Sequence, residues 1–258
     1  MAQTIAVLSQ KGGTGKTTTV RTLADVLRRI KVRTLAVDLD PQGNLSDYFD
    51  LPPDSEPTIA DVLAGAAPAA EAIHQDVIPA SLNLAETELM LGGKIGREMT
   101  LRRALAKVQG EYEIVLIDCP PSLGLLTVNA LVAADYALVT AEAQYFALQG
   151  VEQAMEVIEI ARDSLNDELS LLGVLLNLAD MRTVHSREAK ASLKERFGEK
   201  VFETVVRGSI AYAESAERAM SILDHRPDLG ADYVAVADEL LGRLPGMAGA
   251  RKRLEQLR

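Results

Sequence analysis

The sequence predicts a single α/β domain, a doubly wound and mostly parallel β-sheet with helices on both faces. Short apolar runs of β type alternate with amphipathic segments of helical length, which is typical of parallel sheets. The chain has no Trp and only 4% aromatic residues, so Leu, Val, Ala and Ile must form the core, as they do in buried parallel strands. A length of 258 residues suits one domain, and no linker or repeat divides residues 1–258.

The elements follow from hydrophobic periodicity. Apolar runs predict strands at 5–8, 34–37, 114–117, 136–141, 171–176 and around 202–206. Helical spacing predicts helices over 20–27, 101–108, 151–158, 186–196 and 231–244. Residues 52–80 are rich in Pro, Ala and acidic residues, and we expect irregular structure there with one short helix around 59–63. Residues 250–258 are expected to form a basic tail.

Charge and composition narrow the class of protein. The first residues lack the pattern of a signal peptide, no long apolar run predicts a membrane span, and Cys119 is the single cysteine, so we expect a cytoplasmic protein without disulfides. The net charge is −10, which alone argues against non-specific DNA binding. However, residues 1–181 carry 13 Lys/Arg against 25 Asp/Glu, whereas residues 182–258 carry 14 against 12. The last third could therefore present a basic surface, although solvated helix faces explain this balance equally well.

A glycine-rich loop follows the first strand. Residues 11–18 are Lys-Gly-Gly-Thr-Gly-Lys-Thr-Thr and precede a predicted helix. Glycine lets backbone N–H groups approach a phosphate closely, and the start of the helix adds partial positive charge. Lys16 supplies a mobile charge for the outer phosphates, and the Thr17 hydroxyl suits Mg²⁺. We therefore predict a nucleotide-binding loop made of Gly12, Gly13, Thr14, Gly15, Lys16, Thr17 and Thr18.

The loop differs from the ordinary phosphate-binding pattern. Position 10, where that pattern has glycine, is Gln10, and Lys11 stands at the loop entrance. In this respect the loop resembles the deviant Walker A group of P-loop ATPases, which includes relatives of ParA, MinD and the nitrogenase iron protein. In that group the entrance lysine reaches across a dimer to the phosphates held by the other subunit. The resemblance implies a binding and catalytic role for Lys11, which would stabilise charge that develops during phosphoryl transfer.

Carboxylates follow two of the predicted strands. Asp38 and Asp40 end the second strand, and their spacing of two puts both side chains on one side. Asp118 ends the apolar run 114–117, the Walker B arrangement for Mg²⁺. Carboxylates there can hold Mg²⁺, directly or through water, or orient an attacking water. We predict Thr17, Asp38 and Asp118 as the metal site. Taken alone, the residues after Asp40 would indicate only a turn.

The segment Val-Asp-Leu-Asp-Pro-Gln-Gly-Asn at 37–44 closely resembles the ParA/Soj family. So do Pro120-Pro121-Ser122 and the Thr-x-Asn-Ala-Leu at 127–131. The similarity covers nearly the whole chain and is strongest at 9–48, 112–150 and 170–183. It implies the P-loop NTPase fold, with ATP and Mg²⁺ as cofactors. Asp40 would position the hydrolytic water, Asp38 would be a metal-shell or switch residue, and Asn177 would contact the adenine edge. Relatives often carry Gln-x-Glu just before residues 145–148, whereas here Glu142 and Gln144 are interchanged.

The resemblance also implies DNA contacts. Arg182 matches a basic residue that contacts DNA in Soj-like proteins. A second arginine of those proteins falls near Ala211, and the Gly-Lys pair that often follows is replaced by Ala219-Met220. Phosphate contacts tolerate changes of position better than base readout does, so other arginines can substitute. The candidates are Arg207, Arg218 and Arg226.

The favoured function is an ATP-dependent DNA-segregation ATPase that hydrolyses ATP to ADP and phosphate with Mg²⁺. By resemblance, ATP would close a homodimer that binds double-stranded DNA non-specifically at the nucleoid, and a ParB-like partner would stimulate hydrolysis and release it. A MinD-like membrane-associated ATPase is the alternative, and it needs bulky apolar anchors where the tail offers only Leu254 and Leu257. A metabolic synthetase or reductase on the same scaffold also remains open, but a reductase would need paired cysteines.

Overall fold

The computed structural model describes residues 2–52, 54–144 and 146–256. Within these residues seven strands form one sheet in the order β3-β2-β4-β1-β5-β6-β7, and each neighbouring pair is parallel. The predicted parallel α/β fold is therefore confirmed. The strands are β1 Gln3–Leu8, β2 Thr34–Asp38, β3 Val77–Ile78, β4 Ile114–Asp118, β5 Tyr136–Glu142, β6 Ser170–Ala179 and β7 Val201–Arg207.

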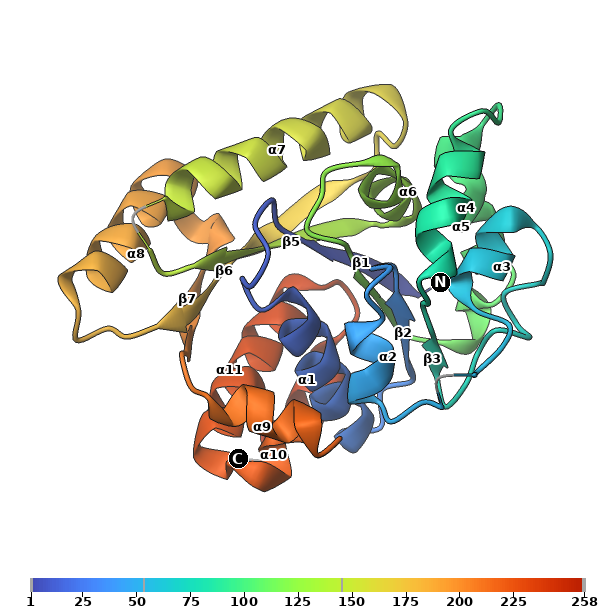
Figure 1. Cartoon of the computed structure of the whole chain (residues 1–258). Helices are drawn as coiled ribbons and strands as arrows, with labels where there is room; N and C mark the ends of the chain where they lie inside the picture. Colours follow the sequence, from blue (N-terminus) through green and yellow to red (C-terminus); the bar gives the residue numbers. More distant parts are fainter. Residues whose placement is uncertain (1, 53, 145, 257–258) are drawn as a thin grey trace.

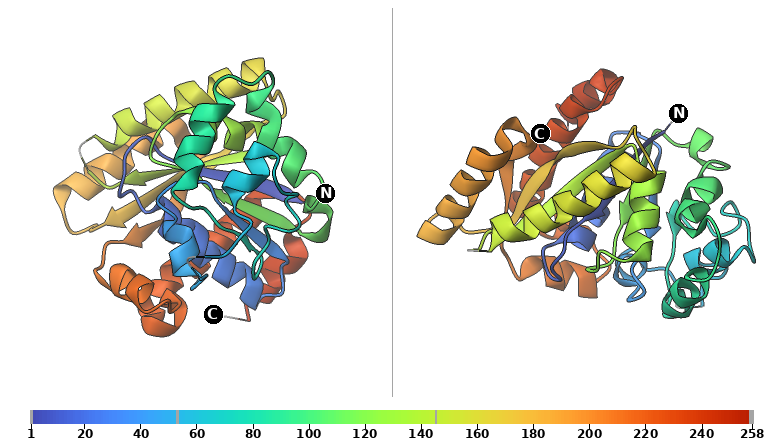
Figure 2. Two further views of the ribbon diagram at one scale, coloured as in Figure 1. Left: turned by 45° about the vertical axis from the view of Figure 1, so that its right-hand side comes forward. Right: turned by 90° about the horizontal axis from the view of Figure 1, so that it is seen from above.

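Helices cover both faces of this sheet (Figure 1). One face carries α1 Lys16–Arg29, α2 Asn44–Tyr48, α9 Ala211–Glu217, α10 Ile222–His225, α11 Pro227–Arg243 and α12 Ala248–Leu254. The other face carries α3 Ile59–Ala64, α4 Asn83–Leu91, α5 Thr100–Leu105, α6 Leu125–Ala133, α7 Ala147–Ser164 and α8 Val184–Phe197. Figure 2 shows the sheet between these layers. Short 3₁₀ turns lie at Arg97–Met99, Gln109–Glu111 and Gly198–Lys200.

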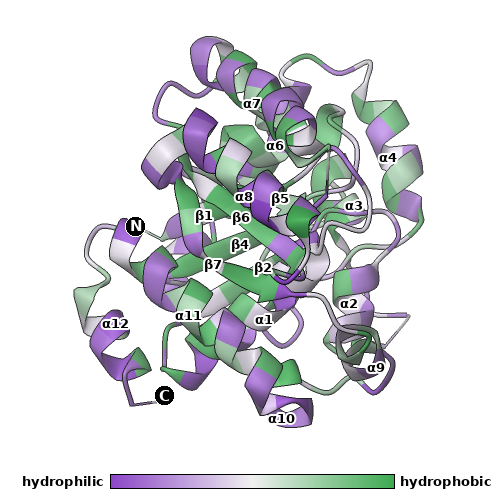
Figure 3. Cartoon of the chain, turned by 90° about the vertical axis from the view of Figure 1, so that its left-hand side faces the viewer, coloured by the Kyte–Doolittle hydropathy of each residue, from purple (hydrophilic) through white to green (hydrophobic). Residues whose placement is uncertain are grey.

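Alternation along the central strands divides the core into two halves. Ile5 and Val7 of β1 face α1 and α11, whereas Ala6 and Leu8 face the layer of α6 and α7. Both sets are fully buried because successive strand side chains point to opposite faces and both faces are covered by helices. The central strands are accordingly mostly apolar in Figure 3, and the helices carry many of the polar residues.

Two of the predicted segments differ from the structure. Residues 52–80 contain the expected short helix, α3, but also β3, which at two residues is too short for periodicity to detect. The basic tail is not a free segment in its described part. It forms α12, whose Ala250 and Leu254 are buried in the α1/α11 half of the core. Leu257 lies outside the described residues.

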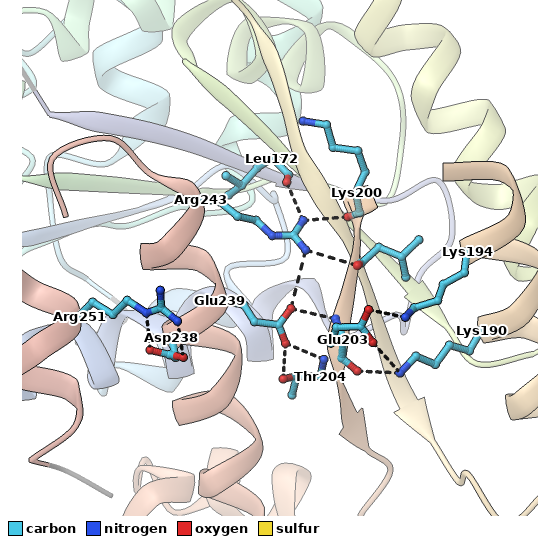
Figure 4. Close-up of polar contacts among 11 residues, drawn as sticks. Leu172, Lys190, Lys194, Lys200, Glu203, Thr204, Asp238, Glu239, Arg243 and Arg251 are labelled. Atoms are coloured by element: carbon cyan, nitrogen blue, oxygen red, sulfur yellow. Dashed lines mark hydrogen bonds and ion pairs between the residues drawn. The ribbon is translucent and has the colours of Figure 1, made fainter. Parts of the chain in front are cut away.

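At one edge of the sheet, side chains from α8 and α11 form hydrogen bonds with the backbone of β7 (Figure 4). The Glu239 carboxylate accepts hydrogen bonds from the backbone N–H groups of Glu203 and Thr204, and Lys190 Nζ donates to the Glu203 carbonyl. Arg243 donates to the carbonyls of Leu172, Lys200 and Val201 and lies 4.0 Å from the centre of the Phe202 ring. Pairing an edge strand with charged side chains protects it from joining another sheet. This network also fixes the strand that carries Arg207.

None of the described helices is both long enough and apolar enough to cross a bilayer.

Candidate active site

The glycine-rich loop connects β1 to α1 at the carboxyl end of the sheet, where ligands bind in folds of this class. Gly13 and Gly15 have φ values of 76° and 82°, a region that side chains with a Cβ rarely adopt. A Cβ on Gly15 would also approach Asn177 Nδ2 to 2.8 Å. No side chain caps α1, so its first N–H groups are free to bind an anion.

Buried hydroxyls hold the loop from below. Thr14 Oγ1 shares hydrogen bonds with Ser9 Oγ at 2.8 Å and Thr140 Oγ1 at 3.0 Å. Lys16 Nζ donates to Ser9 Oγ at 3.2 Å, and Lys16 is only 6% exposed. Burial lowers the pKa of Lys16, while the nearby charge of Asp118 opposes that shift. The sequence analysis missed Ser9 and Thr140, although each is a hydroxyl at or near the end of a strand.

A pocket of about 650 Å³ opens over the loop. It contains seven of the predicted site residues, Gly12, Gly13, Gly15, Lys16, Thr17, Thr18 and Asp40. Its other walls are Gln42, Asn44, Asp47, Tyr48, Pro121, Leu178, Ala216 and Glu217. Thr14 is buried and lies behind the loop. A pocket of this size with a glycine-rich floor and one inward lysine has the form of a phosphate-ester site.

Asp118 fits a divalent cation. It is fully buried beside Lys16, and among the described residues neither of its carboxylate oxygens makes a hydrogen bond of ordinary geometry, although the Thr17 hydroxyl lies close enough to lower its pKa. Burial, followed by the charge of Asp38, raises the pKa of Asp118 well above its usual range. An unpartnered buried carboxylate is costly, and a bound cation would remove that cost. The described residues contain no group of three His, Cys, Asp or Glu for a metal cage, but Mg²⁺ typically uses one or two carboxylates plus phosphates.

Asp38 differs from Asp118, its neighbour in register on the adjacent strand. Its Oδ1 accepts the N–H of Asp40, and its Oδ2 accepts the N–H and hydroxyl of Ser46. Burial raises the pKa of Asp38 to about 6, although these hydrogen bonds lower it. Both carboxylate oxygens of Asp38 therefore accept hydrogen bonds from within the 38–46 segment. This arrangement disagrees with the expectation that Asp38 belongs to the metal site with Thr17 and Asp118.

Asp40 has the position expected of a residue that acts on bound nucleotide. It lines the pocket and is 8% exposed. Its Oδ1 accepts the N–H of Gln42 at 3.0 Å, in the loop that leads to α2. The carboxylate is thus held at the pocket wall by its own loop.

Lys11 lies outside the pocket that its own loop forms. Its side chain is 64% exposed, and its ammonium donates to Glu142 Oε2 at 2.7 Å and Gln144 Oε1 at 3.3 Å. It lines a separate hollow of about 360 Å³ between the loop and the start of α7. The two residues that are interchanged relative to the family pattern are therefore the two that hold this lysine.

Asn177 lies within β6, beneath the glycine-rich loop. It is 1% exposed, and its Nδ2 donates to the Thr14 carbonyl at 2.8 Å and to Thr19 Oγ1 at 3.2 Å. It therefore supports the loop from beneath and does not line the pocket, whereas the next residue, Leu178, does. The expected contact with the adenine edge is not supported by this geometry.

Arg182 and Arg207, two of the predicted DNA-binding arginines, lie at or just beyond the carboxyl ends of β6 and β7. Ala179 and Arg207 pair in register at the ends of β6 and β7, and Arg182 follows three residues later. Arg182 is bonded to Asp180, Arg207 to Asp232 and Arg226 to Asp228. Arg218 is exposed at the end of α9, next to the pocket residues Ala216 and Glu217. Acidic partners therefore offset much of the charge of Arg182, Arg207 and Arg226.

Known proteins share this architecture. The family model described as AAA domain matches residues 2–171. The sporulation initiation inhibitor protein Soj of Bacillus subtilis is 37% identical, covering 93% of this chain and 98% of Soj. The chromosome partitioning protein ParA of Caulobacter vibrioides is 38% identical, covering 93% and 94%.

Two solved structures are similar to this chain in fold. Cobyrinic acid a,c-diamide synthase from Mycobacterium smegmatis, with bound ATP analogue and magnesium, has a TM-score of 0.77 and 36% identity, covering 87% of this chain and 96% of that one. The septum site-determining protein MinD from Pyrococcus horikoshii, complexed with Mg-ADP, shares the fold at a TM-score of 0.78 and 23% identity, covering 97% and 99%. With the glycine-rich loop, the entrance lysine and the strand-end carboxylates in place, this chain belongs to the ParA/Soj family of P-loop ATPases.

Proposed function

We propose that this protein is a Mg²⁺-dependent DNA-segregation ATPase whose ATP-bound homodimer binds double-stranded DNA without sequence specificity. The observation that carries the proposal is the position of Lys11. It lies beside its own nucleotide pocket, on the outer surface, where it can reach a second subunit. Relatives named for chromosome partitioning, similar over nearly their whole length, support the same function.

The chemistry is divided among the chain's own residues. The loop N–H groups and Lys16 bind the phosphates, and Asp40 orients the attacking water at the pocket wall. Thr17 and Asp118 would hold Mg²⁺, which neutralises phosphate charge when bound. Lys11 of a second subunit would add positive charge as the β–γ bridging oxygen of the leaving ADP develops negative charge. Hydrolysis would then open the dimer and release it from DNA.

DNA binding would use the edge that carries Arg182, Arg207, Arg218 and Arg226. Backbone phosphates supply most of non-specific affinity, so a symmetric dimer that doubles the number of arginines would bind much more tightly than a monomer. The protein would associate with the nucleoid in this state. A ParB-like DNA-binding partner would stimulate hydrolysis, and the acidic first two thirds of the chain would attract a basic segment of that partner.

The structure favours this function over a MinD-like role at a membrane. An amphipathic anchor needs an apolar face available to lipid. In α12 both Ala250 and Leu254 are buried against the core, while Arg251, Lys252 and Arg253 face outward. Leu254, the one large apolar residue of α12, is thus packed into the fold.

A gel shift of plain duplex DNA tests the proposal, with ADP, ATP and a slowly hydrolysed analogue at two salt concentrations. We expect retention only with the triphosphates, and weaker retention at the higher salt. Binding to anionic vesicles without binding to DNA would favour the membrane function. Turnover that requires a small-molecule co-substrate would favour a synthetase, a function suggested by the similarity to the diamide synthase.

A further inference from the structure

A buried serine, Ser46, connects Asp38 at the end of β2 to Ala80 in the segment after β3. Ser46 lies in α2 and is 7% exposed. Its N–H and its hydroxyl both donate to Asp38 Oδ2, at 3.0 and 2.8 Å. Its hydroxyl oxygen also accepts the N–H of Ala80 at 3.0 Å. The hydroxyl therefore donates one hydrogen bond and accepts one, both within the protein.

The second oxygen of Asp38 continues this connection to the active site. Asp38 Oδ1 accepts the N–H of Asp40 at 3.2 Å. A continuous path of hydrogen bonds thus runs from Ala80 through Ser46 and Asp38 to the backbone of Asp40. Between Asp40 and Ser46 the chain turns at Gly43, whose φ is 69°. The turn has hydrogen bonds of its own, from the N–H of Gln42 to Asp40 Oδ1 and from the N–H of Gly43 to the Asp40 carbonyl, both at 3.0 Å. The Asp38 carboxylate connects this turn to α2 and therefore contributes to where Asp40 lies.

We propose that Ser46 is a positioning residue for ATP hydrolysis, which acts through Asp38 to hold the Asp40 carboxylate at the pocket wall. Asp38 shares this task and does not bind the metal, which is left to Asp118 and Thr17. The inference rests on the proposed function, because it concerns the residue that orients the attacking water. Neither Ser46 nor Asp38 lines the nucleotide pocket, so their effect is on geometry.

Substitution of the hydroxyl separates this role from a general contribution to folding. Ser46→Ala should reduce kcat by about tenfold to a hundredfold, the loss typical of a catalytic group displaced by about 1 Å. The affinity for a fluorescent ATP analogue should stay within about twofold, because the hydroxyl makes no contact with the pocket. Ser46→Thr keeps the hydroxyl and should restore most of the rate. Ser81→Ala is the matched control, since Ser81 Oγ lies nearby in the 79–83 segment, buried and without a hydrogen-bond partner among the described residues.

A magnesium titration tests the assignment of Asp38 independently and does not depend on Ser46→Ala folding well. Asp38→Asn should lower kcat while the Mg²⁺ concentration for half-maximal rate stays near that of the unmodified protein. Asp118→Asn should raise that concentration at least about tenfold, because it removes a charge that would contact the cation. A rise in both variants would overturn the inference, because Asp38 would then be a metal ligand.

Other outcomes would contradict the positioning role of Ser46 or the proposed function itself. A Ser46→Ala protein with unchanged kcat, or with kcat and analogue affinity lost together, would contradict the positioning role. So would a Ser81→Ala protein as slow as Ser46→Ala. If the unmodified protein neither binds nor hydrolyses ATP, the proposed function itself fails, and this result is distinct from the other outcomes because it needs no variant.

Discussion

The nucleotide pocket and the arginine-bearing edge are built in opposite ways. Lys16 is 6% exposed and lies among carboxylates and hydroxyls that are themselves buried. Arg182 has a side chain that is 91% exposed and is bonded to Asp180, two residues away. The first region is fixed by contacts between elements far apart in the sequence. In the second, Arg182 and Arg226 pair with acids two residues away, and only Arg207 pairs with a distant residue, Asp232. We infer that the pocket is preorganised, whereas the edge must exchange its own ion pairs for phosphate contacts.

This contrast sets the size of the effects that we expect. Buried charges act at low effective dielectric and their removal is costly, whereas exposed ion pairs contribute little and are screened by salt. Substitutions in the pocket should therefore change binding or turnover by large factors at any salt concentration. Substitutions at the edge should produce small, salt-dependent changes. The following predictions test the difference, in descending order of effect.

Lys16→Ala should abolish nucleotide binding. The ammonium supplies a charge-assisted hydrogen bond to phosphate in a buried setting, and its loss should weaken the affinity for a fluorescent ATP analogue more than about a hundredfold. Equilibrium titration measures this affinity. Lys107→Ala, at an exposed lysine far from the pocket, is the control and should bind normally. Retained affinity in Lys16→Ala would remove the basis for a preorganised pocket.

Asp40→Ala should bind ATP and fail to hydrolyse it. Loss of a residue that orients the attacking water typically costs about 10²- to 10⁴-fold in rate. Phosphate release in the steady state measures turnover, and the analogue titration checks that affinity is kept. If Asp40→Ala turns over at the normal rate, the proposed mechanism is wrong.

Glu142→Gln should make the ATP-dependent dimer form more readily. The carboxylate holds Lys11 within its own subunit, and an exposed pair of this kind contributes up to about 1 kcal/mol, or about fivefold in the ATP concentration at half-dimerisation. Light scattering against ATP concentration follows the change. Glu152→Gln, which loses an exposed pair with Arg196 instead, should leave the curve where it is. An unchanged curve for Glu142→Gln would indicate that the Lys11 contact has no influence on assembly.

Asp180→Asn should strengthen DNA binding by a few fold at low salt and less at high salt. The substitution removes a negative charge and frees Arg182 for phosphate. Bonds from Arg182 lower the pKa of Asp180 to about 2, so this carboxyl is charged throughout the pH range of such assays and the gain requires substitution. Arg182→Ala should reduce the salt slope by about one. Equal affinity of all three proteins would exclude this edge as the DNA-binding surface.

Sequence patterns predicted the pocket better than its supports. The glycine-rich loop, Asp40 and Asp118 have local signals, because each follows an apolar strand at a fixed spacing. Ser46 and Ser9 have none, since an isolated serine acquires its task only when distant segments pack against it. Asn177 was expected at the end of a strand but lies within β6, and only the packing of β6 under the loop determines which way its amide points. The Leu254 side chain was likewise expected in a free tail and is buried.

The central claim is that Lys11 completes the pocket of a second subunit. Sedimentation velocity of Asp40→Ala with ATP and Mg²⁺ tests it most directly, compared with the double variant Lys11→Ala, Asp40→Ala. We predict a dimer for the single variant and a monomer that still binds ATP for the double variant. Dimers of equal stability in both, or a monomer in the single variant despite bound ATP, would contradict the account.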